Sequence, residues 1–215
     1  MGAIIQKYRL FYASVPKVAC TSLKRALFEV ENGFGYRPFY TNGKRWHIHR
    51  LYRPIELTEA LKAELHDYWR VAFVRDPLER FLSAYSNRMV YHNQRSLSAT
   101  DRANLKRHRL TDTPDIHTFI NNFETYVSVC RDIKHHTRPM VEFLGTDPRY
   151  FHRLFRMSEM NEFEMEIKKR TGVHIEVQHA QAHGTKIPKE ELSNLEIEKI
   201  KKLYKQDYNI FGQYF

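Results

Sequence analysis

The sequence predicts an α/β fold in which a central parallel sheet is covered by helices on both sides. Two segments each predict a buried strand that runs into a helix, the first over residues 9–31 and the second over residues 69–91. Fully buried strands are short apolar runs, and parallel strands need long connections that are usually helical. With 215 residues the chain is long enough for such a sheet, so we expect one domain over residues 1–215.

The first segment, RLFYASVPKVACTSLKRALFEVE, predicts a strand, a loop with Lys17 and a helix that opens on Thr21 and Ser22. The first N–H groups of a helix have no intrahelical partner and lie at the positive end of its dipole, so an anion can bind there. The loop lacks the glycines of a nucleoside-triphosphatase P-loop, which argues against ordinary ATP or GTP hydrolysis. The alternative is a proline turn before a helix that Thr or Ser caps.

The second segment contains the apolar run Trp69 to Val74, followed by a helix with Pro77 in its first turn. This arrangement puts Arg75 at the carboxyl end of the strand and Ser83 about two turns into the helix. Arg75 and Ser83 could therefore contact one phosphate from two sides. Because open parallel sheets bind ligands at the carboxyl ends of their strands, we expect both segments to present basic and hydroxyl groups at one edge.

The pair VPKVACTSLKRAL and FVRDPLERFLSAYSNRM resembles the two cofactor-binding segments of sulfotransferases that use 3'-phosphoadenosine 5'-phosphosulfate (PAPS). The similarity is to the carbohydrate group that includes the chondroitin, dermatan and HNK-1 enzymes. It implies a three-layer fold similar to that of P-loop NTPases, and transfer of a sulfuryl group from PAPS to a hydroxyl of a glycan, polysaccharide or glycolipid. The contacts that it implies are Lys17, Ala19, Cys20, Thr21 and Ser22 for the 5'-phosphosulfate, and Arg75 and Ser83 for the 3'-phosphate.

The implied reaction depends on alignment, charge stabilisation and a base that takes the acceptor proton. By analogy with phosphoryl transfer, Lys17 would neutralise charge on the bridging oxygen. No metal ion is required, and the sequence has no H-E-x-x-H or C-x-x-C spacing, with Cys20 and Cys130 far apart.

His49 is the first candidate for the base, with His47 second. In an extended segment, alternation would place both imidazoles on the same side. The segment resembles the H-x-H of heparan and uronyl 2-O-sulfotransferases, in which a histidine is the base, and His49 matches that histidine. The alternative is a surface histidine without a catalytic role.

Three later segments supply further candidates. His136 to Pro139 resembles an H-x-x-P segment that lies near acceptor or cofactor, although a polar loop is the alternative. His183 and Thr185 resemble a late loop of the family that approaches the cofactor. Glu159 lies where the family has an acidic residue after a strand, and it is as readily a neighbour of a helix cap.

The remaining elements follow from apolar spacing and turn residues. Residues 93–114 are polar and basic, and predict a long loop with a short helix that could bind the acceptor. A strand is expected at 153–157, and helices are expected at 57–67 with Thr58 as a possible cap, at 77–91, 119–129, 162–171 ending near Gly172, and 190–208.

The composition is strongly basic, with 35 Lys and Arg against 25 Asp and Glu. A basic protein attracts a polyanionic donor such as PAPS and would also attract an acidic saccharide. Two other classes stay open as alternatives, a basic nucleic-acid-binding protein and a nucleotide-dependent kinase. The first predicts a DNA or RNA module and the second a glycine-rich loop with acidic Mg²⁺ ligands, and neither signature is present in the sequence.

No apolar run is long enough to span a membrane, and the amino terminus has no signal-peptide pattern. Animal members of the family usually have a Golgi anchor and a stem. We therefore expect a bacterial-type enzyme of the cytoplasm, or an excised catalytic domain of the Golgi lumen. Two cysteines without a dense framework fit a reducing compartment.

Overall fold

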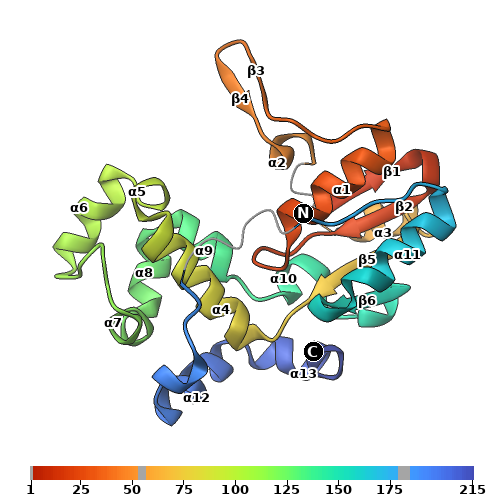
Figure 1. The fold of residues 1–215 in the computed structure, drawn as a ribbon. Helices are drawn as coiled ribbons and strands as arrows, with labels where there is room; N and C mark the ends of the chain where they lie inside the picture. Colours follow the sequence, from red (N-terminus) through yellow and green to blue (C-terminus); the bar gives the residue numbers. More distant parts are fainter. Residues whose placement is uncertain (1, 53–56, 179–184) are drawn as a thin grey trace. The chain divides into compact units, whose positions relative to one another are not determined.

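The computed structural model describes residues 2–52, 57–178 and 185–215 (Figure 1). The chain divides into two compact units, which we describe separately. Unit 1 comprises Met1–Arg75, Met140–Gln181 and Gln213–Phe215, and unit 2 comprises Asp76–Pro139 and Ala182–Gly212. That the chain forms one domain over residues 1–215 stays a prediction.

Unit 1 contains a four-stranded sheet in the order β1-β2-β5-β6, formed by β1 (Gly2–Ile5), β2 (Leu10–Ala13), β5 (Trp69–Val74) and β6 (Arg153–Arg156). β2, β5 and β6 are parallel, as predicted, with Ala13 opposite Ala72 and Val74 opposite Arg156. The sheet differs from the predicted parallel sheet at one edge only, where β1 is antiparallel to β2. A short 3-10 turn connects these two strands, which is possible only for antiparallel neighbours.

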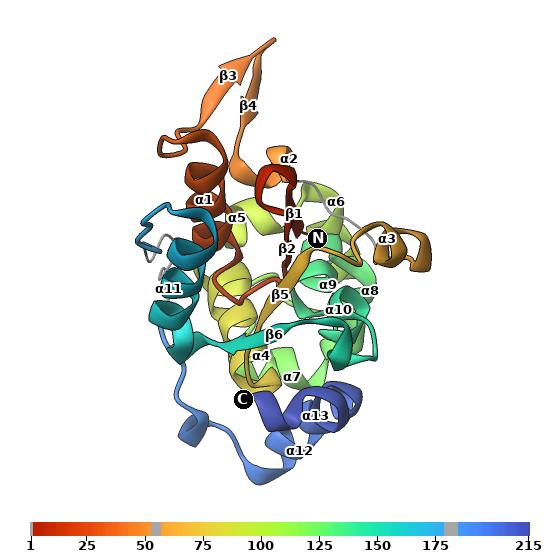
Figure 2. The same cartoon turned by 90° about the vertical axis from the view of Figure 1, so that its right-hand side faces the viewer.

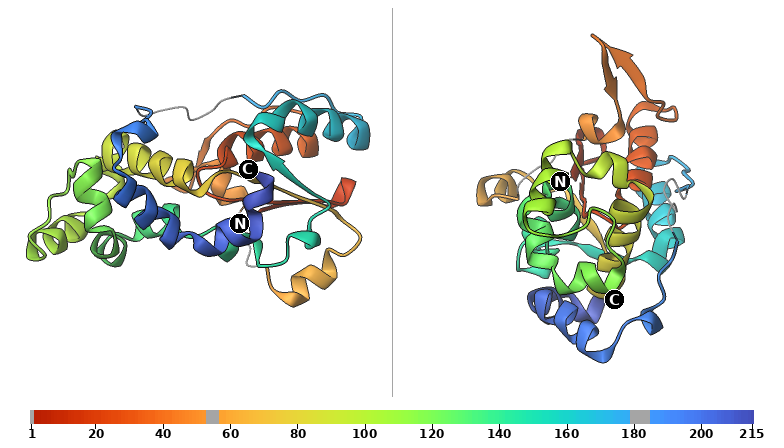
Figure 3. Two further views of the ribbon diagram at one scale, coloured as in Figure 1. Left: turned by 90° about the horizontal axis from the view of Figure 1, so that it is seen from below. Right: turned by 90° about the vertical axis from the view of Figure 1, so that its left-hand side faces the viewer.

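Helices cover both faces of this sheet, so the predicted three layers are confirmed. Figures 2 and 3 show α1 (Cys20–Asn32) and α11 (Met160–Thr171) on one face, and α3 (Glu59–Glu64) and α10 (Val141–Leu144) on the other. Thr58 caps α3, as predicted. The buried face of α1 carries apolar residues with helical spacing, namely Leu23, Ala26, Leu27 and Val30.

An aromatic cluster holds β5, β6 and α11 together. The ring of Phe73 lies 5.1 Å from that of Phe155 and 5.2 Å from that of Phe163, and Trp69 stacks on Phe163 at 6.5 Å. Phe73, Phe155 and Phe163 have no exposed surface. Burial of such rings makes a large apolar contribution to folding and fixes how α11 lies on the sheet.

A two-stranded hairpin, β3 (Phe39–Thr41) and β4 (Lys44–Trp46), extends from unit 1 beyond α1 (Figures 1 and 2). Its turn is Asn42-Gly43, with φ of 48° and 68°. Positive φ at both central residues is the requirement of a type I′ turn, which Asn-Gly satisfies at low cost. The hairpin leads directly into α2 (Ile48–Leu51).

Unit 2 is helical in the residues that the structure describes. Its core contains Phe81, Phe119, Tyr126 and Tyr204, each at most 1% exposed. The elements are α4 (Pro77–Tyr85), a π-helix (Ser86–Tyr91), α5 (Asn93–Ser96), α6 (Ala99–Arg107), α7 (Ile116–Asn121), α8 (Phe123–Val129), α9 (Arg131–Thr137), α12 (Asn194–Leu203) and α13 (Lys205–Phe211).

Three predicted elements of unit 2 need correction. Residues 93–114 are largely α5 and α6 instead of a long loop, because Leu97 and Leu105 are buried in the core. The helices expected at 119–129 and 190–208 are each two helices, with breaks at Asn122 and Tyr204. Apolar spacing continues across both breaks, so the sequence pattern does not detect them.

Candidate functional site

The loop that joins β2 to α1 holds two residues in the left-handed region, Lys17 with φ of 66° and Ala19 with φ of 46°. This conformation costs a non-glycine residue about 1–2 kcal/mol, so it persists only where the surroundings hold it. Here Val15 and Val18 are fully buried and anchor the loop. A left-handed residue followed by a right-handed one turns their N–H groups toward a common point, where an anion can bind.

The amino terminus of α1 adds further donors to this loop. Ala19 is the N-cap residue and makes no side-chain hydrogen bond, so the alternative in which Thr or Ser caps the helix is wrong. Leu23 N donates the first helical bond to Ala19 O, at 3.0 Å. The N–H groups of Cys20, Thr21 and Ser22 belong to the first turn of the helix. The side chain of a cap residue often accepts a hydrogen bond from such N–H groups, but the side chain of Ala19 offers no acceptor. No acidic residue lies in this turn, which preserves its positive potential.

Arg75 lies beside this loop. Its Nη1 donates to Lys17 O at 3.4 Å. Because β2 and β5 are parallel neighbours, the residues that follow them meet at the same edge of the sheet. The prediction that Arg75 and the Lys17 loop lie at the same edge of the sheet is therefore confirmed. Their roles in binding stay predictions.

His49 reaches back to α1 from α2. Its Nε2 lies 2.9 Å from Thr21 Oγ1, and its Nδ1 lies 3.4 Å from Lys24 Nζ. Lys24 Nζ also donates to Tyr52 O at 3.0 Å. Burial lowers the pKa of Lys24 to about 8. The predicted base thus lies against a hydroxyl of the proposed phosphate loop and a buried amine.

The conformation of this histidine segment differs from the expectation. His47 is extended at the N-cap position, but His49 lies in the helical turn α2 and not in an extended strand. The two rings are still near each other, with centroids 5.8 Å apart. Burial lowers the pKa of His47, and the positive charges of Arg50, Arg45 and Lys24 lower it further.

Two of the predicted cofactor contacts lie in unit 2. Asp76 caps α4 by accepting from Glu79 N at 3.0 Å, and Ser83 is half-buried two turns further on. Ser86 lies three residues after Ser83 on the same helix face, and its Oγ donates to Thr185 O at 2.7 Å. The structure therefore brings the exposed Thr185 to the helical segment that carries Ser83. His183 lies outside the described residues.

His136 lies in α9 of unit 2, a helix where a polar loop was the alternative prediction. Its Nε2 lies 3.5 Å from Asp132 Oδ1, one turn earlier in the helix. Burial lowers the pKa of His136 to about 4, although the hydrogen bond with Asp132 opposes this. Such a pKa makes His136 a weaker base than an ordinary histidine.

The chain matches the sulfotransferase family over residues 3–214. It belongs to this family. Among curated proteins it is similar to human carbohydrate sulfotransferase 9, with 27% identity over 105 residues that make up 48% of this chain and 24% of the relative. Mouse carbohydrate sulfotransferase 14 is 36% identical over 88 residues, which are 40% of this chain and 22% of the relative.

Zebrafish (Danio rerio) carbohydrate sulfotransferase 11 is 30% identical over 88 residues, 40% of this chain and 25% of the relative. The aligned segments thus span about a quarter of the length of these curated relatives. No solved structure matches the chain significantly.

Several residues of this sulfotransferase-family chain have contacts that bear on their predicted roles. Cys20 is a half-buried free thiol at the start of α1. Glu159 accepts from Arg156 N at 2.6 Å and from Arg153 Nη2 at 3.3 Å. These bonds support the structural interpretation, in which Glu159 is part of a helix cap. Lys24 was missed by the sequence analysis. Its position three residues after Thr21, on the same helix face, is the signal that could have identified it.

Within residues 2–52, 57–178 and 185–215, no group of three or more His, Cys, Asp or Glu side chains is arranged to hold a metal ion. In the same part of the chain, no helix is both long and apolar enough to cross a membrane.

Proposed function

We propose that this chain transfers the sulfuryl group of PAPS to a hydroxyl group of a carbohydrate. The main observation behind the proposal is the strained loop before α1, in which Lys17 and Ala19 are left-handed and Arg75 bonds to Lys17 O. Membership of the sulfotransferase family supports the reaction class. The names of the relatives, all carbohydrate sulfotransferases, support the class of acceptor.

The residues at this edge suit the phosphosulfate end of the donor. The N–H groups of the first turn of α1 would bind its oxygens, together with the Thr21 and Ser22 hydroxyls, and Lys17 would neutralise charge that develops on the leaving phosphate. Arg75 would bind the 3'-phosphate, and Ser83 and Thr185, which lie in unit 2, stay predicted contacts of the cofactor. When bound, PAPS supplies the sulfuryl group and leaves as adenosine 3',5'-bisphosphate. The proposed transfer needs no metal ion.

His49 is the proposed base, and Lys24 would set its tautomer. When Lys24 is an ammonium ion it donates to Nδ1, so a neutral imidazole must carry its hydrogen on Nε2 and cannot accept a proton there. When Lys24 is neutral it can accept from Nδ1–H, and Nε2 then has a lone pair toward Thr21 Oγ1. His49 is in its base form only in the second state, and His47 and His136 would be secondary candidates.

Calorimetry with adenosine 3',5'-bisphosphate tests the donor site. We expect micromolar binding that depends on the 3'-phosphate, so that adenosine 5'-monophosphate and ATP bind more weakly. Arg75→Ala should weaken binding of the bisphosphate by about 10- to 100-fold, the range for a lost charged hydrogen bond. The matched control is Arg9→Ala, which removes an exposed arginine of unit 1 that pairs with Asp67.

Two outcomes would count against the donor site. Absence of bisphosphate binding in the wild-type protein would remove the basis of the proposed reaction. Equal affinities for the bisphosphate and the 5'-monophosphate would remove the role given to Arg75.

A further inference from the structure

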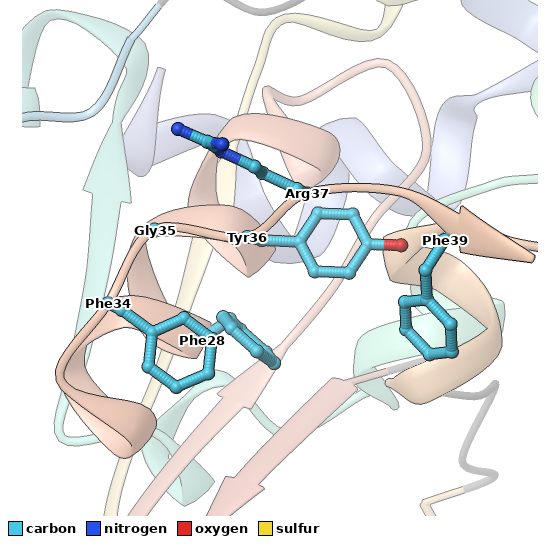
Figure 4. Close-up of a pocket in the computed structure, with 6 residues that line it drawn as sticks. All are labelled: Phe28, Phe34, Gly35, Tyr36, Arg37 and Phe39. Atoms are coloured by element: carbon cyan, nitrogen blue, oxygen red, sulfur yellow. The ribbon is translucent and has the colours of Figure 1, made fainter.

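A pocket lined by aromatic side chains (Figure 4) lies in unit 1, apart from the residues proposed to bind the donor. Its volume is about 540 Å³. Phe28, in α1, lies edge-on to Phe34 at 5.5 Å and to Tyr36 at 5.3 Å. This volume is within the usual range for small-molecule sites. The lining consists of Phe28, Phe34, Gly35, Tyr36, Arg37 and Phe39.

The aromatic surface continues from the pocket onto the β3–β4 hairpin. Phe39 stacks on Trp46 across the two strands, with ring planes 4° apart and centroids 5.9 Å apart. Tyr36 Oη donates to Trp46 O at 2.7 Å, which ties the pocket to the hairpin. Phe34 is 63% exposed and Tyr40 is 71% exposed. Contiguous aromatic rings left in water are unfavourable for folding alone and typically mark a binding surface.

The surroundings of these rings are basic. Between Asn32 and Tyr52 the sequence contains Arg37, Lys44, Arg45 and Arg50 and no Asp or Glu. Burial raises the pKa of Tyr36, while the positive charges of Arg25 and Arg45 oppose this, and Arg37 lines the pocket itself. A ligand for this surface must therefore combine an apolar face with negative charge.

An acidic sugar has both properties. The C–H groups on one face of a pyranose ring carry partial positive charge and pack on the negative face of an aromatic ring. A carboxylate or sulfate on the same sugar matches the fork of an arginine side chain. Moreover, the hairpin is continuous with the segment that carries the proposed base, because Trp46 is followed by His47, Ile48 and His49.

We propose that the pocket and the β3–β4 hairpin form a subsite for an acidic saccharide, which holds a sugar unit next to the one that is sulfated. The inference rests on the proposed function, because it assigns this surface to the acceptor of the same reaction. Phe39, Tyr40 and Trp46 would support sugar rings, and Arg37 and Arg45 would pair with carboxylates along the saccharide.

Binding of an unsulfated chondroitin hexasaccharide tests the subsite directly. The chain has two tryptophans, and Trp69 is buried at 8% exposure, so fluorescence of a Trp69→Phe protein reports on Trp46 in the hairpin. We expect the hexasaccharide to change this fluorescence saturably. Calorimetry on the wild-type protein, which retains Trp69, should give the same affinity, and no binding by either method would overturn the proposal.

Matched variants separate the subsite from general effects. Tyr40→Ala and Arg37→Gln should each weaken hexasaccharide binding at least fivefold, since both side chains are exposed and their loss leaves the core intact. The controls are Met165→Ala and Lys168→Gln, exposed residues of α11, and they should bind like the wild type. Equal weakening by the control variants would overturn the proposal.

Three further probes test the chemistry of the ligand. The carboxyl-reduced hexasaccharide keeps the rings without the charge, and polyglutamate keeps the charge without the rings, so both should bind at least tenfold more weakly than the acidic hexasaccharide. Equal binding of polyglutamate would show a purely electrostatic surface and overturn the proposal. Tighter binding of oligothymidylate would also overturn it, in favour of a nucleic-acid surface.

Failure of the subsite can be distinguished from failure of the proposed function. Tyr40→Ala should bind adenosine 3',5'-bisphosphate as the wild type does, because Tyr40 lies outside the proposed donor loop. If the bisphosphate binds but hairpin variants bind the hexasaccharide normally, the subsite is wrong and the function stands. If the wild-type protein does not bind the bisphosphate, the proposed function itself fails.

Discussion

Lys24 has no exposed surface, and its amine lies between His49 Nδ1 and Tyr52 O. A buried ammonium ion loses hydration, so its neutral form becomes accessible near neutral pH, and its pKa is lowered to about 8. The pKa of a lysine in water is about 10.4. Protonation of Lys24 therefore changes within the pH range in which enzymes are commonly assayed.

The rate of sulfuryl transfer should consequently rise through about pH 8, because loss of the Lys24 proton gives His49 its base tautomer. In Lys24→Met this rise should disappear, while His49→Ala should lower turnover by about 10²- to 10⁴-fold, the range for general base catalysis. Turnover measured from pH 6.5 to 9.5 at saturating donor checks both. A pH profile in Lys24→Met that is unchanged from the wild type would contradict the role given to Lys24.

Lys17 combines a charge with a left-handed backbone, and the two can be tested separately. Lys17→Ala and Lys17→Gly should both lower transfer by about 10²- to 10³-fold, as for loss of one electrostatic contact in a transition state. Only glycine relieves the strain, so Lys17→Gly should be the more stable of the two proteins. Initial rates and urea unfolding measure these effects, and near-normal transfer in Lys17→Gly would exclude a role for the charge.

At the scale of elements, helix ends show how local sequence is translated into structure. α11 ends at Gly172, which has φ of 75° and nothing within 4 Å of the position of an added Cβ. Gly212 is equally open but has φ of −55°, which any residue adopts. The two glycines therefore differ in backbone conformation and not in space.

Gly172→Ala should lower the free energy of unfolding by about 1 kcal/mol, because alanine is strained in the left-handed region. Gly212→Ala should be neutral or stabilising by up to about 1 kcal/mol, since it reduces the freedom of the unfolded chain. Urea denaturation followed by circular dichroism measures both changes. Similar destabilisation by both substitutions would show that space, and not φ, limits these positions.

The histidine segment shows how an element can be mispredicted while its residues are brought together. Alternation predicted an extended His47-Ile48-His49, but Ile48 is buried and the segment turns into α2. A single helical turn has too few residues to show a period, so the sequence cannot distinguish it from a strand. Within this turn the centroids of the two rings lie 5.8 Å apart.

At the scale of the whole molecule, the two compact units raise the question of how they unfold. Both tryptophans lie in unit 1, whereas the buried Cys130 lies in unit 2, so each unit has its own probe. Burial raises the pKa of the Cys130 thiol to about 12, which makes it unreactive while unit 2 is folded.

If the chain is one domain, as the sequence predicts, both probes should report one cooperative transition. Urea unfolding of a Cys20→Ser protein, followed by tryptophan fluorescence and by thiol labelling of Cys130, should therefore give coincident midpoints. Two separate transitions would show that the units are independent domains. The Met165→Ala control protein should give the same coincidence as its parent.

The sequence by itself determined the parts of this protein whose signals are local. Trp69 to Val74 is a strand and Pro77 opens a helix, because apolar runs and a proline in the first helical turn act through neighbouring residues. The same two segments also determined which basic and hydroxyl side chains lie near Lys17 and Arg75 in the sequence. These contiguous motifs also carried the resemblance to sulfotransferases, and the family match over residues 3–214 confirms it.

Only the tertiary structure decided which distant side chains meet. His49 and Lys24 are 25 residues apart, and their contact depends on how α2 packs against α1. The left-handed backbone of Lys17 and Ala19 is likewise held by the burial of Val15 and Val18, which no local preference of those residues predicts. The direction in which β1 pairs with β2 was likewise absent from the sequence-based expectation, because strand pairing depends on the partner strand as well as on the residues of the strand itself.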